Sequence, residues 1–177
     1  DSYLVARLTA GAVHATDPSN ASRTLLYDLA AGCWSDELCE LLDVPITALP
    51  EVRRSSGEFG RCDRAAFLGL DLPIAGIAGD QQAALFGQCC FAEGESKCTY
   101  GTGSFILVNT GPEVVRSDAG LLTTVAWDIG DGLVYALEGA VFVTGAAVQW
   151  LRDGLGIIST AAETEAVARS VPNADGV

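Results

Sequence analysis

The apolar run at residues 72–78, L-P-I-A-G-I-A, constrains the fold of this chain more than any other feature. Near-continuous apolar segments of this length are typical of strands that are buried on both faces of a sheet. Gly79 and Asp80 end the run, and residues 81–90 then carry a helical pattern. A buried strand that leads directly into a helix is typical of an α/β fold.

The length and composition are those of a folded protein. The chain has 177 residues, enough for one domain or for parts of two. Hydrophobic residues make up 49% of it and charged residues 19%, which excludes intrinsic disorder and a coiled coil. Asp and Glu total 23 against 10 Lys and Arg, a net charge of −13 that argues against nucleic acid as a partner.

The six cysteines and the single histidine form no pattern typical of a metal site. The sequence contains no Cys-x-x-Cys pair, so we expect no metal bound by these residues. Cys89 and Cys90 are adjacent in an apolar helical pattern, which favours free thiols packed in a core over a disulfide framework. Free thiols indicate a reducing, cytoplasmic compartment.

The longest apolar stretch, residues 133–151, has about the length of a membrane span. It contains Glu138 and Gln149 and is interrupted by glycines, so a strand, a turn and a helix describe it better. We therefore expect no membrane span, and the N-terminus carries no signal-peptide pattern. The chain begins at Asp1 and contains no Met, so we expect a piece trimmed from a longer protein.

The two halves of the chain differ in their expected secondary structure, and we place a domain boundary near Cys89. The first half mixes helices and strands, with a polar loop at 15–24 and a helix that Ser35 caps. Gly130-Asp131-Gly132 is a strong hairpin signal in the second half. There we expect an antiparallel meander and then two helices: strands at 98–100, 105–109, 121–127 and 133–138, and helices at 145–152 and 160–169.

Asp80 is the first candidate for a chemical role. It lies where a buried strand meets a helix N-terminus, the position at which α/β folds place ligand-binding groups. One interpretation is that Asp80 only caps the helix, which is the commonest use of Asp there. The other is a general base that orients a hydroxyl group, kept ionised by the helix dipole.

Two glycine-containing segments are candidates for phosphate contacts. In Gly101-Thr102-Gly103 the glycines allow close approach of the backbone to a phosphate, although a plain hairpin turn explains the segment equally well. Residues 144–147, T-G-A-A, enter a helix and could expose its N–H groups to a nucleotide. Close helix packing is the alternative there.

In order and spacing, these segments resemble the FGGY carbohydrate kinase family, in particular its glycerol-phosphorylating members. The resemblance covers essentially the whole chain and rests on six segments: DPSNASRT, LPEVRRSS, GIAGDQQAALFGQ, TYGTGSFILVNTG, GLLTTVAW and YALEGAVFVTGAAVQWLRD. It implies an α/β fold with an actin-like ATPase architecture: two ribonuclease H-like domains, with mixed sheets flanked by helices. Residues 1–88 would be the C-terminal part of the first domain, on the glycerol side. Residues 89–177 would be the N-terminal part of the second, on the nucleotide side.

The resemblance also implies roles for individual residues. Asp80 would be the catalytic base, and Asp80, Gln81 and Phe105 would bind glycerol. Thr102, Gly145 and Gln149 would lie on the nucleotide side, with ATP and Mg²⁺ as cofactors. The family's phosphate-binding hairpin and metal-associated aspartate have no counterpart in these residues, so no metal ligand is expected here.

The implied activity is ATP-dependent phosphorylation of glycerol to sn-glycerol 3-phosphate, by an enzyme of which this chain is a part. The isolated chain would then be inactive, and the full-length enzyme would be a dimer or tetramer. Two alternatives stay open: a family member acting on a ketose or longer polyol, and a non-catalytic scaffold of the same fold.

We expect Lys97, the only lysine, to be a solvated residue at a strand edge.

Overall fold

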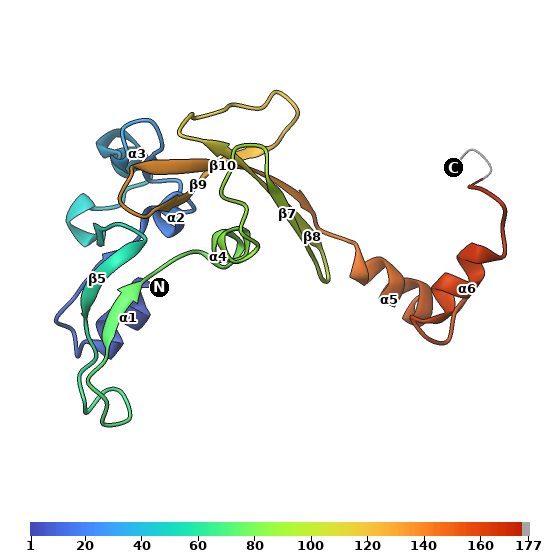
Figure 1. Cartoon of the computed structure of the whole chain (residues 1–177), viewed down its shortest axis with the longest axis horizontal. Coiled ribbons are helices and arrows are strands. Elements are labelled where there is room, and N and C mark those ends of the chain that lie inside the picture. Colours follow the sequence, from blue (N-terminus) through green and yellow to red (C-terminus); the bar gives the residue numbers. More distant parts are fainter. Residues whose placement is uncertain (175–177) are drawn as a thin grey trace. The chain divides into compact units, whose positions relative to one another are not determined.

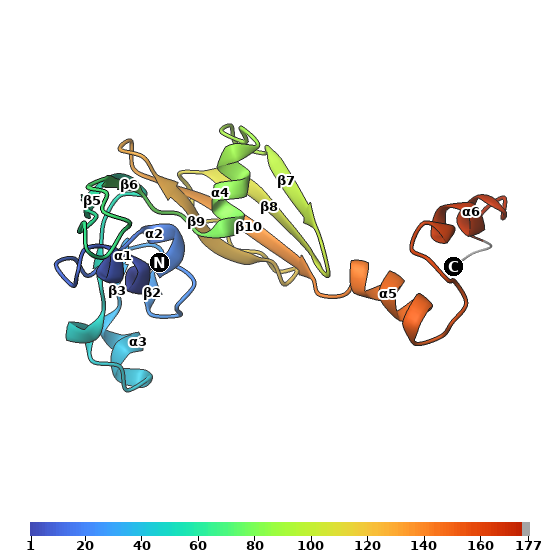
Figure 2. The same ribbon diagram turned by 90° about the horizontal axis from the view of Figure 1, so that it is seen from below.

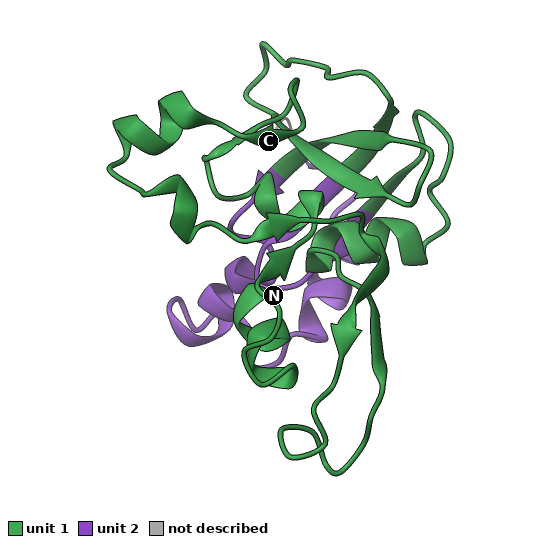
Figure 3. Cartoon of the chain, turned by 90° about the vertical axis from the view of Figure 1, so that its left-hand side faces the viewer, with its two compact units in different colours: residues 1–97, 107–139 green, residues 98–106, 140–177 purple. Residues whose placement is uncertain are grey.

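The computed structural model describes residues 1–174. It divides into two compact units, which Figure 3 shows in different colours. Unit 1 consists of residues 1–97 and 107–139, and unit 2 consists of residues 98–106 and the chain from Ala140 onward. Three strands therefore continue from one unit into the other: β7 (Ser96–Tyr100), β8 (Ser104–Gly111) and β10 (Leu133–Val141).

Unit 1 begins with short helices and two-residue strands, of which Figure 2 labels α1, α2, α3, β2 and β3; Figure 1 shows the same part of the chain. They are α1 (Ser2–Leu8), β1 (Ala15–Thr16), α2 (Pro18–Ala21), β2 (Tyr27–Asp28), β3 (Cys33–Trp34), α3 (Asp36–Leu41), the 3-10 helix η1 (Ile46–Ala48) and β4 (Glu51–Val52). Strand β1 pairs with β4 in parallel, and β2 pairs with β3 in antiparallel fashion. The expected cap of α3 is confirmed, because the Ser35 hydroxyl accepts a hydrogen bond from the Leu38 N–H.

The apolar run at 72–78 forms the short strand β6 (Pro73–Gly76), which pairs with β5 (Ser56–Arg61). The expectation that it is buried on both faces is wrong, since Leu72 keeps 46% of its surface exposed. A strand is buried on both faces only where layers cover each face. Within residues 1–174, β6 belongs to a two-stranded sheet, and most of its residues stay exposed.

The strands of the second half form one four-stranded sheet with the order β7-β8-β10-β9, in which β9 spans Leu122–Asp128. The four expected strands are confirmed, and so is the antiparallel hairpin of β9 and β10. Gly130 and Gly132 in its turn have φ of 123° and 105°, values that favour glycine. The meander is wrong in its order, because β10 lies between β8 and β9.

Helix α4 (Asp80–Gly87) packs on the sheet through a small apolar core (Figure 2). Leu85 is fully buried there with residues of β8, β9 and β10: Leu107, Ala126, Trp127 and Ala136. A second cluster joins Ala21 and Tyr27 to Val125 and Tyr135 of the sheet. Successive side chains of a strand point to opposite faces, so Tyr135 and Ala136 of β10 serve different clusters. Helix α4, helix α2 and strand β2 are thereby held to one sheet.

Unit 2 contains helices α5 (Gly145–Asp153) and α6 (Glu163–Arg169). The first begins where the sequence predicts, and the second begins three residues later than the predicted Thr160. An ion pair between Arg169 and Glu165 at 2.8 Å spans one turn of α6.

The six cysteines are free thiols, as expected, but only half of them are packed. Cys39, Cys62 and Cys90 are buried, whereas Cys33, Cys89 and Cys98 are exposed, so the expectation of a packed thiol is confirmed for Cys90 and wrong for Cys89. Cys89 has φ of 58°, a left-handed conformation in the loop that follows α4. None of the helices within residues 1–174 has both the length and the apolar character that crossing a membrane requires.

Tyr27 provides a test of the second cluster. Burial, followed by the nearby Tyr135 hydroxyl, raises the pKa of Tyr27 from 10.0 to about 12. The fold therefore favours the neutral phenol. This contribution to stability is complete below pH 10, and it is lost as the pH rises from 10 through 12. Tyrosinate absorbance during alkaline titration should show an ionisation step near pH 12 that Tyr27→Phe removes.

The control is Tyr3→Phe, at a residue that is 73% exposed on α1, which should leave the step near pH 12 in place. A step near pH 12 that survives in Tyr27→Phe would show that this cluster does not bury the Tyr27 hydroxyl.

Candidate functional site

Asp80 is the first residue of α4, and the N-cap of that helix is Gly79. Because Gly79 has no side chain, the first turn is not capped in the usual way by Asp, Ser or Thr. The Asp80 side chain is exposed, and its Oδ2 accepts a hydrogen bond from Gln81 Nε2 at 3.2 Å. The capping interpretation is therefore not what the geometry shows. The carboxylate lies at the positive end of the helix dipole and is open to solvent.

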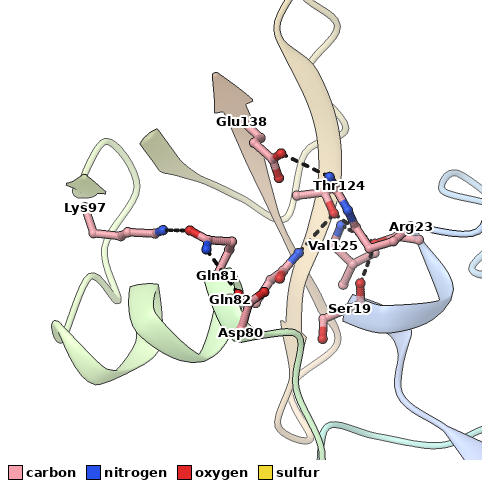
Figure 4. A network of polar contacts seen from close by, with 10 residues as sticks. Ser19, Arg23, Asp80, Gln81, Gln82, Lys97, Thr124, Val125 and Glu138 are labelled. Atoms are coloured by element: carbon pink, nitrogen blue, oxygen red, sulfur yellow. Dashed lines mark hydrogen bonds and ion pairs between the residues drawn. The ribbon is translucent and has the colours of Figure 1, made fainter. Parts of the chain in front are cut away.

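Lys97 approaches Asp80 through Gln81, as Figure 4 shows. Its ammonium group, on β7, donates a hydrogen bond to Gln81 Oε1. Lys97 does lie on an edge strand, as expected, but it is only 6% exposed, so the expectation that it is solvated is wrong. A buried ammonium group is costly unless it is hydrogen-bonded, and Gln81 supplies one acceptor.

The Asp17 carboxylate, at the N-terminus of α2, is the centre of a buried polar network. It is fully buried and caps α2, accepting from the backbone N–H groups of Ser19 at 3.2 Å and Asn20 at 3.0 Å. It also accepts from three side chains: the hydroxyls of Ser19 and Ser55, each at 2.7 Å, and the Asn20 amide at 2.8 Å. Five donors around one carboxylate satisfy it without a neighbouring cation.

This network reaches the start of α4 directly. The Ser19 hydroxyl, which donates to Asp17, accepts the Gly79 N–H at 2.8 Å. The Ser55 hydroxyl likewise donates to Asp17 and accepts the Asp128 N–H at 3.1 Å. Gly79, the residue before Asp80, is thus bound to a residue of α2 that lies 60 positions earlier in the chain.

A second set of polar contacts ties the same loop and helix to the sheet (Figure 4). Thr124 Oγ1 on β9 is 2.9 Å from the Ser22 hydroxyl, and it accepts from Gln82 Nε2 at 3.2 Å. Arg23 forms an ion pair at 3.0 Å with the buried Glu138 of β10. Gln82 follows Asp80 by two residues, so α4 is fixed on its sheet-facing side by a polar bond as well as by Leu85.

In unit 2, the turn at Gly101–Gly103 docks on the N-terminus of α5. The Gly101 carbonyl accepts the Gly145 N–H at 3.0 Å. The Thr102 carbonyl accepts the N–H groups of Thr144 at 2.9 Å and Ala146 at 3.1 Å. The expectation that these N–H groups are exposed to a nucleotide is therefore wrong, because carbonyl oxygens of the turn occupy them. The close-packing alternative is what the structure shows.

Glycine is required at both sides of this contact. A Cβ on Gly145 would overlap the Gly101 carbonyl oxygen, and one on Gly103 would lie 2.7 Å from the Val141 carbonyl oxygen. The two glycine motifs thus bring Thr102 and Gly145 together, with the Thr102 side chain exposed. Gln149 is exposed one turn further along α5, and Phe105 is half-buried on β8.

No metal site can be built from residues 1–174 alone, since they contain no group of three or more His, Cys, Asp or Glu side chains placed to hold an ion. A cavity of about 620 Å³ lies on another side of α4, lined by apolar residues such as Phe86 and Trp127. Asp80 does not line it.

Sequence reasoning placed Asp80 at a helix start but missed the groups that hold it there. The turn-rich composition of residues 15–24 predicts a polar loop, but Asp17 followed by Pro18 is also a helix-start signal, and α2 begins there. Lys97 was missed because burial of a single lysine leaves no local pattern. Its one signal was that the chain contains no other lysine.

Known proteins resemble this chain along almost its whole length. Residues 1–87 match the N-terminal domain, and residues 96–175 the C-terminal domain, of the FGGY family of carbohydrate kinases. The glycerol kinase of Alkaliphilus oremlandii is 56% identical over all 177 residues. The chain covers 35% of that protein and so spans about a third of the length of the curated relatives it matches.

Two solved structures show the likeness in three dimensions. The crystal structure of Plasmodium falciparum glycerol kinase with ADP matches 97% of this chain with a TM-score of 0.89 and 39% identity. The chain covers 34% of that structure. The xylulose kinase of Rhodospirillum rubrum matches with a TM-score of 0.78 and 26% identity, over 97% of this chain and 35% of the other.

Ser19→Ala tests whether the buried network fixes the start of α4. The variant removes both the donor to Asp17 and the acceptor for Gly79, so it should lower the free energy of unfolding by about 1–3 kcal/mol. Urea unfolding followed by tryptophan fluorescence measures the change. Ser19→Thr keeps the hydroxyl and should recover most of the loss. Equal stability of the alanine variant and the unmodified chain would contradict the network.

Proposed function

This chain belongs to the FGGY family of carbohydrate kinases, and from that premise we propose that it supplies the catalytic base of an ATP-dependent glycerol kinase. The product would be sn-glycerol 3-phosphate. The single observation that carries the proposal is Asp80, a carboxylate on the first turn of α4 with a hydrogen-bonded amide beside it. The likeness to glycerol kinases over all 177 residues supports glycerol as the substrate.

In the proposed reaction, Asp80 accepts the proton of a terminal hydroxyl group of glycerol. The freed oxygen attacks the γ-phosphorus of ATP, so an O–P bond forms as the bond between the γ-phosphorus and the bridging oxygen breaks. ADP leaves with that electron pair. Phosphoryl transfer depends mainly on alignment of the two oxygens and on neutralisation of charge. A base held on a fixed helix start meets the first of these needs.

We assign the other acceptor contacts by the same resemblance. Gln81 would bind a second hydroxyl group of glycerol through its amide. Phe105 would provide an apolar wall against the carbon chain, which favours a short substrate over a ketose. This assignment separates glycerol from the substrate named for the Rhodospirillum rubrum relative, xylulose kinase, whose fold is similar.

On the nucleotide side we assign Thr102, Gly145 and Gln149. Support comes from the exposed hydroxyl of Thr102 on a turn that the α5 N-terminus holds in place. Mg²⁺ bound with ATP would supply charge neutralisation on the phosphates. Residues 1–174 offer no cluster to hold that ion, so we derive no step through it.

We further propose the domain assignment of residues 1–88 to the first domain and 89–177 to the second. The interval 88–95, which separates the two matched ranges of the family's domains, supports a boundary there.

We also propose a reducing, cytoplasmic compartment, which the six free cysteines support.

Activity is best tested in a chimera, because the chain covers about a third of its relatives. Residues 1–177 would replace the matching segment of the Alkaliphilus oremlandii glycerol kinase, and glycerol-dependent formation of ADP would be measured. Xylulose and ribulose would be tested in parallel. The 177-residue chain alone should show no turnover, since the charge on the transferring group would not be neutralised. A preference for a ketose would favour the alternative family activity.

Asp80→Asn in the chimera tests the base. We expect kcat to fall by a factor of ~10²–10⁴ with little change in glycerol binding, because the amide cannot take the proton. The matched control is Asp71→Asn, which removes a carboxylate paired with Arg61 on the surface and should leave turnover unchanged. Near-normal turnover of Asp80→Asn would overturn the assignment.

Thr102→Ala tests the nucleotide side. Loss of one hydrogen bond to a charged phosphate should cost about 1.5–3 kcal/mol in kcat/KM for ATP, while KM for glycerol stays nearly constant. Thr164→Ala on α6 serves as the control within the same unit. If the variant instead weakens glycerol binding alone, the turn at Gly101–Gly103 contacts the acceptor and not the nucleotide.

A further inference from the structure

The contact of Lys97 with Gln81 determines which way the Gln81 amide points. An ammonium group has three donors and no acceptor, so only the amide oxygen of Gln81 can face it. Lys97 Nζ indeed donates to Oε1. The other end of the amide, Nε2, is then left to face Asp80, and it donates to Oδ2 at 3.2 Å.

The same contact limits the positions that the Asp80 carboxylate can take. The hydrogen bond from Gln81 to Oδ2 restricts rotation of the Asp80 carboxylate about its Cβ–Cγ bond. The other oxygen, Oδ1, is left to accept a hydrogen bond from an incoming hydroxyl group. The backbone of Asp80 is fixed independently, through the bond from Gly79 to Ser19. Orientation of the carboxylate therefore depends on Gln81, whose amide orientation in turn depends on Lys97.

Burial makes this arrangement costly. Lys97 is only 6% exposed, and lysine is rarely buried to this extent. Stability alone does not require an ammonium group inside the unit, since buried ionic groups can often be replaced by apolar residues without loss.

We propose that Lys97 is a positioning residue for the phosphoryl transfer, which acts through Gln81 to orient the Asp80 carboxylate toward the acceptor hydroxyl. The inference rests on the proposed function, because Asp80 is the base only in that reaction. Lys97 itself touches neither glycerol nor phosphate in this mechanism. Its contribution is to keep the oxygen of the Gln81 amide facing Lys97 and the nitrogen facing Asp80.

The test uses Lys97→Met, Lys97→Arg, Gln81→Ala and the double variant in the active chimera. Methionine keeps an unbranched chain of similar length but cannot donate. We expect Lys97→Met to lower kcat by ~10- to 100-fold, the scale of a misaligned reacting group, with KM for ATP nearly unchanged. Arginine is also a donor without an acceptor and should recover part of kcat.

The decisive result is the coupling between the two positions. If Lys97 acts through Gln81, Lys97→Met should have less than about a threefold effect on kcat once Gln81→Ala is present. Val125→Ala controls for stability, because Val125 is buried in the cluster that does not include α4. It should lower the melting temperature without lowering the kcat of the folded protein.

Three outcomes would overturn the inference. The first is an unchanged kcat in Lys97→Met, and the second is that Lys97→Met lowers kcat equally in the presence and absence of Gln81→Ala. The third is that Val125→Ala lowers kcat as much as Lys97→Met does, when the two variants have the same melting temperature. A chimera that is folded by circular dichroism but forms no ADP with glycerol overturns the proposed function itself. An active chimera with uncoupled variants overturns only the role of Lys97.

Discussion

The buried carboxylate of Asp17 is the interaction on which the arrangement of unit 1 depends. One fully buried group receives five hydrogen bonds, from Ser19, Asn20 and Ser55. Two of the donors, the hydroxyls of Ser19 and Ser55, each accept a backbone N–H from another segment, Gly79 before α4 and Asp128 at the end of β9. An unsatisfied carboxylate in this position would be strongly destabilising, so the loop, the helix start and the strand end form together.

This constraint explains how an exposed side chain can be well oriented. Asp80 is open to solvent, but the residue before it is bound to Ser19, and Gln82 and Leu85 attach α4 to the sheet. A reacting group carried on a rigid element keeps its geometry better than one on a loop. In the same way, we propose that the buried Lys97 orients the Asp80 side chain through its hydrogen bond to Gln81.

Local signals in the sequence predicted the secondary structure well. Ser35 as the cap of α3, the glycines of the β9–β10 turn and the start of α5 are each determined by neighbouring residues. The errors concern features determined by distant residues: the exposure of β6, the position of β10 within the sheet, and the burial of Lys97 against a residue 16 positions away. In the candidate site, the helix start at Asp80 was predictable. The use of the α5 N–H groups by the Gly101 and Thr102 carbonyls was not, because it joins segments more than 40 residues apart. The catalytic roles stay predictions.

The most direct measurement is a crystal structure of the chimera with glycerol and ADP bound. The account predicts a terminal hydroxyl group of glycerol within about 2.6–3.2 Å of the Asp80 carboxylate, with Gln81 bonded to both Asp80 and Lys97. Glycerol bound away from Asp80, in a protein that phosphorylates it, would contradict the account.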